Sequence, residues 1–214
     1  MFTLMVSDPT HRFTAALQIL PEFFEYFNSN QTHHSRFSIE KFYLTMFHME
    51  LRGYSSMLFI LIQAINKISL AFENPQSHLE PKVLLRELDA SSSEVEQIAQ
   101  VDYGTFVSID SQDFKRVVHE LNAPSVNVSL TASQIKFMVP RKEIVLTRRE
   151  RGCITGGIPA GETFRFSITL HPLLFFHDLS HKSKRAWLFM SVDYCTVIIF
   201  PFGIFTQFWV YFPR

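Results

Sequence analysis

Two histidines come closest to a metal-binding spacing in this sequence. His177 and His181 are four residues apart, which places both rings on one face of a helix. Histidine is a common ligand of transition metals, but a zinc site uses three or four protein ligands. Only Asp178 lies close enough in the sequence to add a ligand. The pattern does not complete a metal site, and we expect no metal and no other cofactor.

Other spacings that support catalysis are weak or absent. The segment 156–163 resembles a phosphate-binding loop, but it carries Glu162 where such a loop needs its lysine. No Gly-x-Ser-x-Gly motif occurs, and neither Cys153 nor Cys195 has a histidine at a spacing that indicates a catalytic pair. These observations predict a protein that is not an enzyme.

The composition indicates a folded protein without an overall charge bias. The 214 residues suffice for one large or two small domains. Twenty basic side chains balance 20 acidic ones, so any contact with nucleic acid or an anionic membrane needs a local patch. The 23 phenylalanines and only 7 glycines favour packed strands and apolar helices over disorder. Two cysteines imply no disulfide framework.

Strand patterns outnumber helical patterns along the chain. We expect helices over about 9–20, 40–51, 112–121 and 171–179. We expect strands over 1–6, 36–39, 58–63, 67–73, 83–88, 104–109, 125–130, 135–139, 143–148 and 163–168. The order strand, helix, strands recurs, which predicts an α+β fold with antiparallel sheets.

The apolar segment Trp187–Phe212 permits two structures. Asp193, Pro201, Gly203 and Gln207 divide it into short pieces rich in aromatic and β-branched residues, which favours three closing strands. The same segment is long enough to cross a bilayer as one helix. A small membrane protein anchored by its apolar C-terminus is therefore an alternative.

Repeated apolar patterns indicate a duplicated unit. Phe13, Ala16, Leu17 and Leu20 have the same spacing as Phe114, Val117, Val118 and Leu121, 101 residues later. Arg36–Ile39 recurs as Arg165–Ile168, 129 residues later, and at that same offset Leu58–Gln63 matches Trp187–Val192. Features that recur in one order predict two similar lobes. The unequal offsets make the first lobe 28 residues shorter between its halves.

The second lobe carries a resemblance to a known family. Residues 107–121 contain a strand, a Ser/Asp-capped helix and the pattern Phe-x-Arg-x-x-x-x-Leu, and 126–137 then form a hairpin pattern. In order and spacing these features resemble the eukaryotic DNA sliding clamp family, proliferating cell nuclear antigen. Further similar segments are Phe72–Pro75, Leu88–Asp89, Phe166–Phe176, Met190–Asp193 and Tyr211–Arg214. The resemblance covers about two-thirds of the chain.

The resemblance implies a DNA-clamp fold made of duplicated strand–helix–strands units. It implies a shortened N-terminal clamp domain over 1–80, an interdomain connector over 81–100 and a C-terminal clamp domain over 101–214. In such clamps, protomers close edge to edge into a homotrimeric ring around duplex DNA, in the nucleus. The implied function is a processivity factor for DNA replication and repair enzymes. A subunit of a heterotrimeric checkpoint clamp, which shares the fold, is an alternative.

The resemblance also implies where DNA would be held. Clamp helices line the central hole and contact phosphates through basic side chains, without reading sequence. The corresponding helix faces here carry Arg12, Lys41, Lys115, Arg116 and His119. For each of them an ordinary solvated helix face is the alternative, and Lys115 with Arg116 forms the best-supported pair.

Two further surfaces follow from the resemblance. Clamps bind DNA polymerase and repair factors in an apolar pocket beneath the connector, into which the partner inserts a short aromatic-bearing peptide. By position, that pocket would be formed by Leu88, Val95, Ile98, Tyr211, Phe212 and Pro213. The alternative is that these are core residues. Edge strands at Lys82–Leu85 and Glu143–Leu146 would form the interface between protomers.

Overall fold

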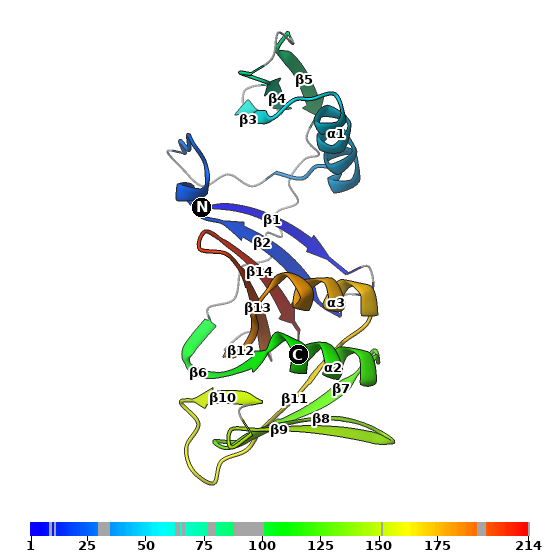
Figure 1. The fold of residues 1–214 in the computed structure, drawn as a ribbon, viewed down its shortest axis with the longest axis vertical. Coiled ribbons are helices and arrows are strands. Elements are labelled where there is room, and N and C mark those ends of the chain that lie inside the picture. The colour runs from blue at the N-terminus through cyan, green and yellow to red at the C-terminus, as the bar shows by residue number, and fades with distance from the viewer. Residues whose placement is uncertain are drawn as a thin grey trace. The chain divides into compact units, whose positions relative to one another are not determined.

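The computed structural model (Figure 1) describes two compact units. The first unit consists of Met1–Asn28 with Ile98–Arg214, and the second of Ser29–Gln97. The described residues are 1–8, 10, 12–29, 35–62, 65, 67–76, 80–87, 101–150, 152–191 and 196–213. Within them the strand pairs are antiparallel and three α-helices are present, so the predicted α+β class is confirmed.

The first unit contains a seven-stranded and a four-stranded sheet. The seven-stranded sheet has the order β1 (Phe2–Ser7), β2 (Thr14–Ile19), β14 (Thr206–Phe212), β13 (Thr196–Phe202), β12 (Arg185–Ser191), β6 (Val101–Asp110) and β10 (Cys153–Gly156). The four-stranded sheet has the order β11 (Phe164–Ile168), β7 (Val126–Leu130), β8 (Gln134–Val139) and β9 (Lys142–Thr147). The described part of this unit contains the helices α2 (Ser111–Glu120) and α3 (Leu173–Lys182) and the short 3-10 helix η1 (Pro21–Phe23).

Two repeats within the first unit exchange their leading strands. One repeat is β6–α2–β7–β8–β9 and the other is β11–α3–β12–β13–β14. The strand β6 pairs with β12 of the other repeat, where Val107 lies opposite Leu188. In the same way β11 pairs with β7, where Phe166 lies opposite Val128. The two repeats therefore share their sheets and form one folding unit.

The main core of the first unit lies where the two helices and both sheets meet. Phe114, Phe137, Phe176 and Phe200 are fully buried there. Burial of one such side chain contributes roughly 1.5–3 kcal/mol, so these rings supply a large share of the stability of the unit. A second cluster on the seven-stranded sheet contains Trp209 and Tyr211.

The described residues of the second unit form one helix over a three-stranded sheet. The helix α1 (Ile39–Leu51) precedes the strands β3 (Ser56–Ile62), β4 (Lys67–Glu73) and β5 (Lys82–Glu87), which pair in that order. Ser38 caps α1, because its hydroxyl accepts a hydrogen bond from the Lys41 N–H at 3.2 Å. Met49 of α1 packs with Ile68 and Phe72 of β4.

The two units divide the chain differently from the predicted boundaries 1–80, 81–100 and 101–214. The N-terminal strands belong to the first unit because β2 pairs along its length with β14, with Thr14 opposite Tyr211. The segment 82–87, predicted to begin the connector, is the strand β5 of the second unit. The rest of the predicted connector, 88–100, lies outside the described residues.

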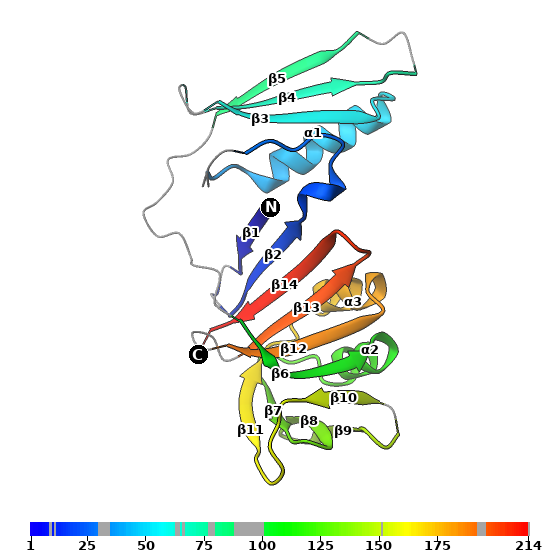
Figure 2. The same ribbon diagram turned by 90° about the vertical axis from the view of Figure 1, so that its left-hand side faces the viewer.

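The predicted helix over 9–20 is wrong, because this part of the chain contains the strand β2 of a hairpin (Figure 2, where β1 and β2 are blue). The Asp8 N–H donates to the Phe13 carbonyl at 2.9 Å and closes the loop between β1 and β2. Ala15 and Ala16 are adjacent in β2 and both buried, so the strand lacks the alternation that identifies strands in a sequence. The spacing of the apolar residues in and beside β2 is therefore also that of a helix, which explains the wrong prediction.

The repeats predicted from the sequence are confirmed in one part and wrong in another. Of the pair Leu58–Gln63 and Trp187–Val192, the described residues 58–62 and 187–191 fall on the corresponding strands β3 and β12, each of which follows a helix. The apolar pattern that begins at Phe114 lies on α2, whereas the matching pattern that begins at Phe13 lies on β2. The described residues before Ile39 therefore contain no counterpart of α2.

The strand β10 lies between the expected strands 143–148 and 163–168, where the sequence predicted neither a helix nor a strand. It pairs with β6, with Cys153 opposite Ile109 and Gly156 opposite Phe106. Cys153 is buried, its Sγ donates to the Leu146 carbonyl at 3.3 Å, and burial raises the pKa of its thiol. An added Cβ atom would lie 2.5 Å from the Phe106 ring at Gly156 and 1.8 Å from the Gly104 carbonyl oxygen at Gly157, so these two glycines permit the close approach to β6.

The three closing strands are confirmed as β12, β13 and β14. Among the described residues, no helix has the length and apolar character needed to cross a membrane. The apolar segment Trp187–Phe212 thus contains pieces of the seven-stranded sheet rather than one helix, and its aromatic and β-branched residues explain that choice.

Candidate nucleic-acid interface

The helix α2 presents a charged face opposite its buried one, with the basic residues Lys115 and Arg116 and the acidic residues Asp113 and Glu120. Asp110 caps the helix, with its side chain accepting from the Gln112 N–H at 2.9 Å. Phe114 is buried against Phe200, with ring centroids 5.5 Å apart. This anchoring leaves Lys115 and Arg116, the next two residues, on the outer side of the helix, where they are half-buried and exposed.

The helix α3 lies beside α2 on the same side of the unit (Figures 1 and 2). Its buried residues are Phe176, Leu179 and Ser180. On the other side His177 is half-buried and His181 is exposed. The two helices therefore bring residues that are far apart in sequence to a common surface.

Side-chain contacts across the two helices join the basic and histidine residues. The Lys115 Nζ and His181 Nδ1 atoms are 2.9 Å apart. The rings of His119 and His177 have centroids 5.1 Å apart, and those of His177 and His181 are stacked with centroids 6.3 Å apart. We call these four residues the α2–α3 row. It forms a continuous surface of groups that are cationic or can become so.

Acidic residues are paired near the edges of this surface. Asp113 lies 3.3 Å from Arg116, and Asp178 lies 3.4 Å from His177. Glu120 forms an ion pair of 2.8 Å with Lys142, which lowers the pKa of its carboxyl. These are exposed pairs, which contribute little to stability. Salt and a competing polyanion therefore displace such partners readily.

Three of the five predicted DNA-binding residues lie together, and two lie elsewhere. Lys115, Arg116 and His119 are on α2. Lys41 is exposed on α1 in the second unit. Arg12 was predicted on a helix face and instead lies in the loop before β2.

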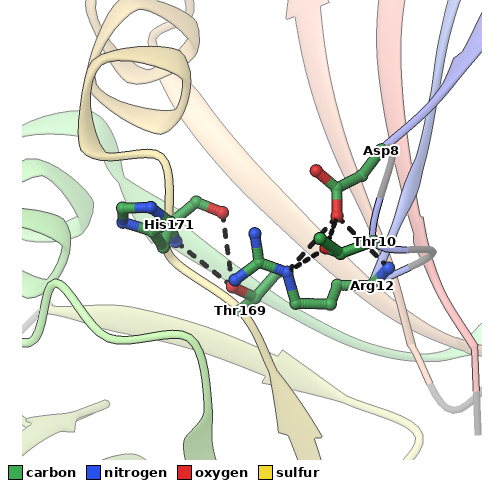
Figure 3. A network of polar contacts seen from close by, with 5 residues as sticks. All are labelled: Asp8, Thr10, Arg12, Thr169 and His171. Carbon is green, nitrogen blue, oxygen red and sulfur yellow. Dashed lines mark hydrogen bonds and ion pairs between the residues drawn. The ribbon is translucent and has the colours of Figure 1, made fainter.

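Arg12 is engaged in a local network of the β1–β2 loop (Figure 3). Its Nε lies 3.3 Å from Asp8 Oδ2 and donates to Thr10 Oγ1 at 2.6 Å. Thr10 also donates to Asp8, and the Arg12 backbone N–H points to the same carboxylate at 3.4 Å. In the figure the Arg12 side chain extends toward Thr169. The Thr169 hydroxyl forms hydrogen bonds with the backbone of His171. The contacts indicate that Arg12 holds the loop closed.

The network makes the stability of this loop depend on pH. The hydrogen bond from Thr10, followed by those from Arg12, lowers the pKa of Asp8 from 3.8. The contribution of Asp8 is therefore present above that unfolded value and is lost as the pH falls through the lower folded pKa. With Asp8→Asn, the stability lost relative to the wild type should be smaller in acid than at neutral pH. Denaturant titrations across that range measure the difference, and Glu22→Gln, at an exposed position, serves as the control.

The predicted partner pocket is described only at its C-terminal part. Leu88, Val95 and Ile98 lie outside the described residues. Tyr211 and Phe212 are 2% and 1% exposed and belong to the core, which was the alternative interpretation of the sequence. Phe212 packs near Phe13 and Phe176 with ring centroids 6.4 Å from each, whereas Pro213 is exposed.

From the sequence, the histidines of α3 were considered only as a pair for a metal, no metal was expected there, and they were not connected with Lys115. The described residues contain no group of three or more His, Cys, Asp and Glu side chains able to hold a metal. Their contact with Lys115 depends on the packing of α3 against α2, which no local pattern reports. The outward i, i+4 spacing on an amphipathic helix was the available signal.

The sequence matches no known family model, and no curated protein matches it significantly. The interpretation of the α2–α3 surface therefore depends on its geometry and on the resemblance described above.

Proposed function

We propose that this protein is a processivity factor of the DNA sliding-clamp kind, which surrounds duplex DNA together with further subunits and tethers replication and repair enzymes. The observation that carries the proposal is the α2–α3 pair, two adjacent helices with basic and histidine side chains outward, supported by sheets that two strand–helix–strands repeats share. The same order of elements occurs in the clamp family that the sequence resembles.

The proposed mechanism is topological. Contacts from Lys115 and Arg116 to phosphates are electrostatic and independent of sequence, so a protein held around the duplex can slide along it. An enzyme bound to the clamp then meets the DNA at a high effective concentration. This role requires no chemistry from the protein itself. A nuclear location belongs to the same proposal.

The sheet edges support assembly into a ring. The strands β5 and β9 are edge strands, one in the second unit and one in the first. Pro81 precedes β5 and Pro140 lies in the turn before β9, so neither interrupts a strand. An antiparallel pairing of β9 in one copy with β5 in the next would be a head-to-tail contact, the type that closes rings. Light scattering would give the mass of the assembly and is expected to show a trimer.

A subunit of a heterotrimeric clamp is the second candidate. The observation that favours it is an exposed apolar stripe on α1, where Tyr43, Phe47 and Leu51 are 64%, 43% and 70% exposed. Exposed apolar patches of this kind mark interaction surfaces. This candidate predicts a monomer by light scattering that forms a complex only when a different clamp subunit is added.

The DNA contact is tested by charge reversal on α2. The double variant Lys115→Glu/Arg116→Glu should bind a mixed-sequence duplex at least roughly tenfold more weakly at low salt. Its slope of log affinity against log salt should be smaller by about 1.8, because each lost phosphate contact removes roughly 0.9. Fluorescence anisotropy of a labelled duplex measures both quantities.

A matched control separates the effect of the α2 surface on DNA binding from the effect of the protein's net charge. Lys136→Glu/Arg165→Glu makes the same change of charge on β8 and β11 of the four-stranded sheet. The control should bind the duplex far better than the α2 variant, and both should retain the far-ultraviolet circular dichroism of the wild type. Equal losses in the two variants, or a wild type that does not bind duplex DNA, would refute the proposed function.

A further inference from the structure

The α2–α3 row links three histidines to one lysine without interruption. Lys115 contacts His181, His181 stacks on His177, and His177 contacts the ring of His119. A lysine ammonium has donors and no acceptor, so in the 2.9 Å contact the Nδ1 atom of His181 accepts and carries no proton. This contact holds the ammonium of Lys115 at the ring of His181.

The charged groups around the row come from several elements. On α2 these are Arg116 with Asp113, and Glu120 with Lys142 of β9. On α3 they are Asp178, which lies beside His177, and the exposed Lys182 in the last turn. Arg185 of β12 donates from its Nε to Ser108 Oγ at 2.7 Å and is turned toward β6. Asp178 is the acidic group in direct contact with a member of the row.

Histidine is the side chain that commonly changes charge between about pH 5 and pH 8. We propose that the α2–α3 row is a proton-dependent part of the phosphate-contacting surface, so that the protein binds duplex DNA more tightly as the pH falls from about 8 to about 6. This inference rests on the proposed function and adds a form of regulation to the same surface.

Protonation acts on this surface in two ways. A proton on His181 Nδ1 removes the acceptor of Lys115, and the freed ammonium can then reach a phosphate. Each protonated ring also adds a positive charge close to another, and that repulsion is relieved when a polyanion is bound. Proton uptake and DNA binding therefore favour each other, as linkage requires.

The test compares affinities at two pH values and constant ionic strength. Anisotropy of a labelled duplex is measured at about pH 6 and about pH 8 with the wild type and with His119→Gln/His177→Gln/His181→Gln. Glutamine keeps a polar side chain and cannot take up a proton in this range. We expect the wild type to bind about tenfold more tightly at the lower pH, with a steeper salt dependence by roughly 0.9 for each added contact. The triple variant should lose most of this difference between the two pH values.

The control is His171→Gln, which changes an exposed histidine of the same unit outside the row. It should keep the pH dependence of the wild type. Equal wild-type affinity at both pH values would overturn this inference and leave the proposed function standing. A triple variant as pH-dependent as the wild type would overturn it too. Absence of duplex binding at either pH would overturn both proposals.

Discussion

Replacing Phe114 with alanine should lower the free energy of unfolding of the first unit by about 3–5 kcal/mol. The side chain is fully buried in the main core and its ring contacts that of Phe200 at 5.5 Å. Removal of the ring leaves a cavity where α2 rests on the sheets, and close-packed surroundings fill such a cavity only partly. The same change should loosen the support of Lys115 and Arg116.

Tryptophan fluorescence during denaturant titration measures this effect in the relevant unit. The two tryptophans of the sequence, Trp187 and Trp209, lie on β12 and β14, so both report on the first unit. Gln112→Ala on the same helix is the control, because Gln112 is exposed and its loss should change stability by less than about 0.5 kcal/mol. An unchanged unfolding midpoint for Phe114→Ala would contradict the placement of α2 over this core.

Replacing Gly157 with alanine should lower the free energy of unfolding of the first unit by about 2–4 kcal/mol. Gly157 has a φ of +69°, and a Cβ atom added there would lie 1.8 Å from the Gly104 carbonyl oxygen. Neither the backbone conformation nor the space suits a side chain. Because the clash is with backbone, β10 and β6 must move apart to relieve it.

A second glycine separates the effect of the backbone conformation from the effect of the steric clash. Gly161 has a φ of +86°, but an added Cβ would have no atom within 4 Å. The variant Gly161→Ala should therefore show only the conformational cost, about 1 kcal/mol. The same fluorescence titration measures both variants. If Gly157→Ala were no more destabilising than Gly161→Ala, the close approach between β10 and β6 would be wrong.

The sequence predicts elements well where a local pattern is unambiguous. The helix α2 has a capping Asp110 and an apolar face, and both lie within a few residues of each other, so α2 was predicted to within one residue. The strand β2 was predicted as a helix because both of its faces are covered: Ala15 packs in the main core, and Ala16 packs in the cluster that contains Trp209 and Tyr211. Its partner β14 is far away in the sequence, and no local pattern contains that information.

The candidate site also shows that a local sequence pattern does not contain information about tertiary contacts. Lys115 and Arg116 are adjacent in the sequence, and the pattern on α2 predicted their outward position. Their contact with the histidines of α3 depends on tertiary packing, so His177 and His181 were considered only with each other. Arg12 was misplaced because the assignment of its element was wrong. The outward position of Lys115 and Arg116 depended on one correctly predicted helix, whereas their contact with the histidines depended on the packing of two helices.

The pairing of β2 with β14 has a consequence for biosynthesis. Thr14 pairs with Tyr211, and the ribosome synthesises all residues between them before Tyr211 is made. This part of the sheet therefore cannot form until then. A nascent polypeptide of this protein therefore carries an open strand border until β14 has been synthesised. Such borders recruit other chains, so holding by chaperones and slow translation would matter more for its yield than the stability of the finished molecule.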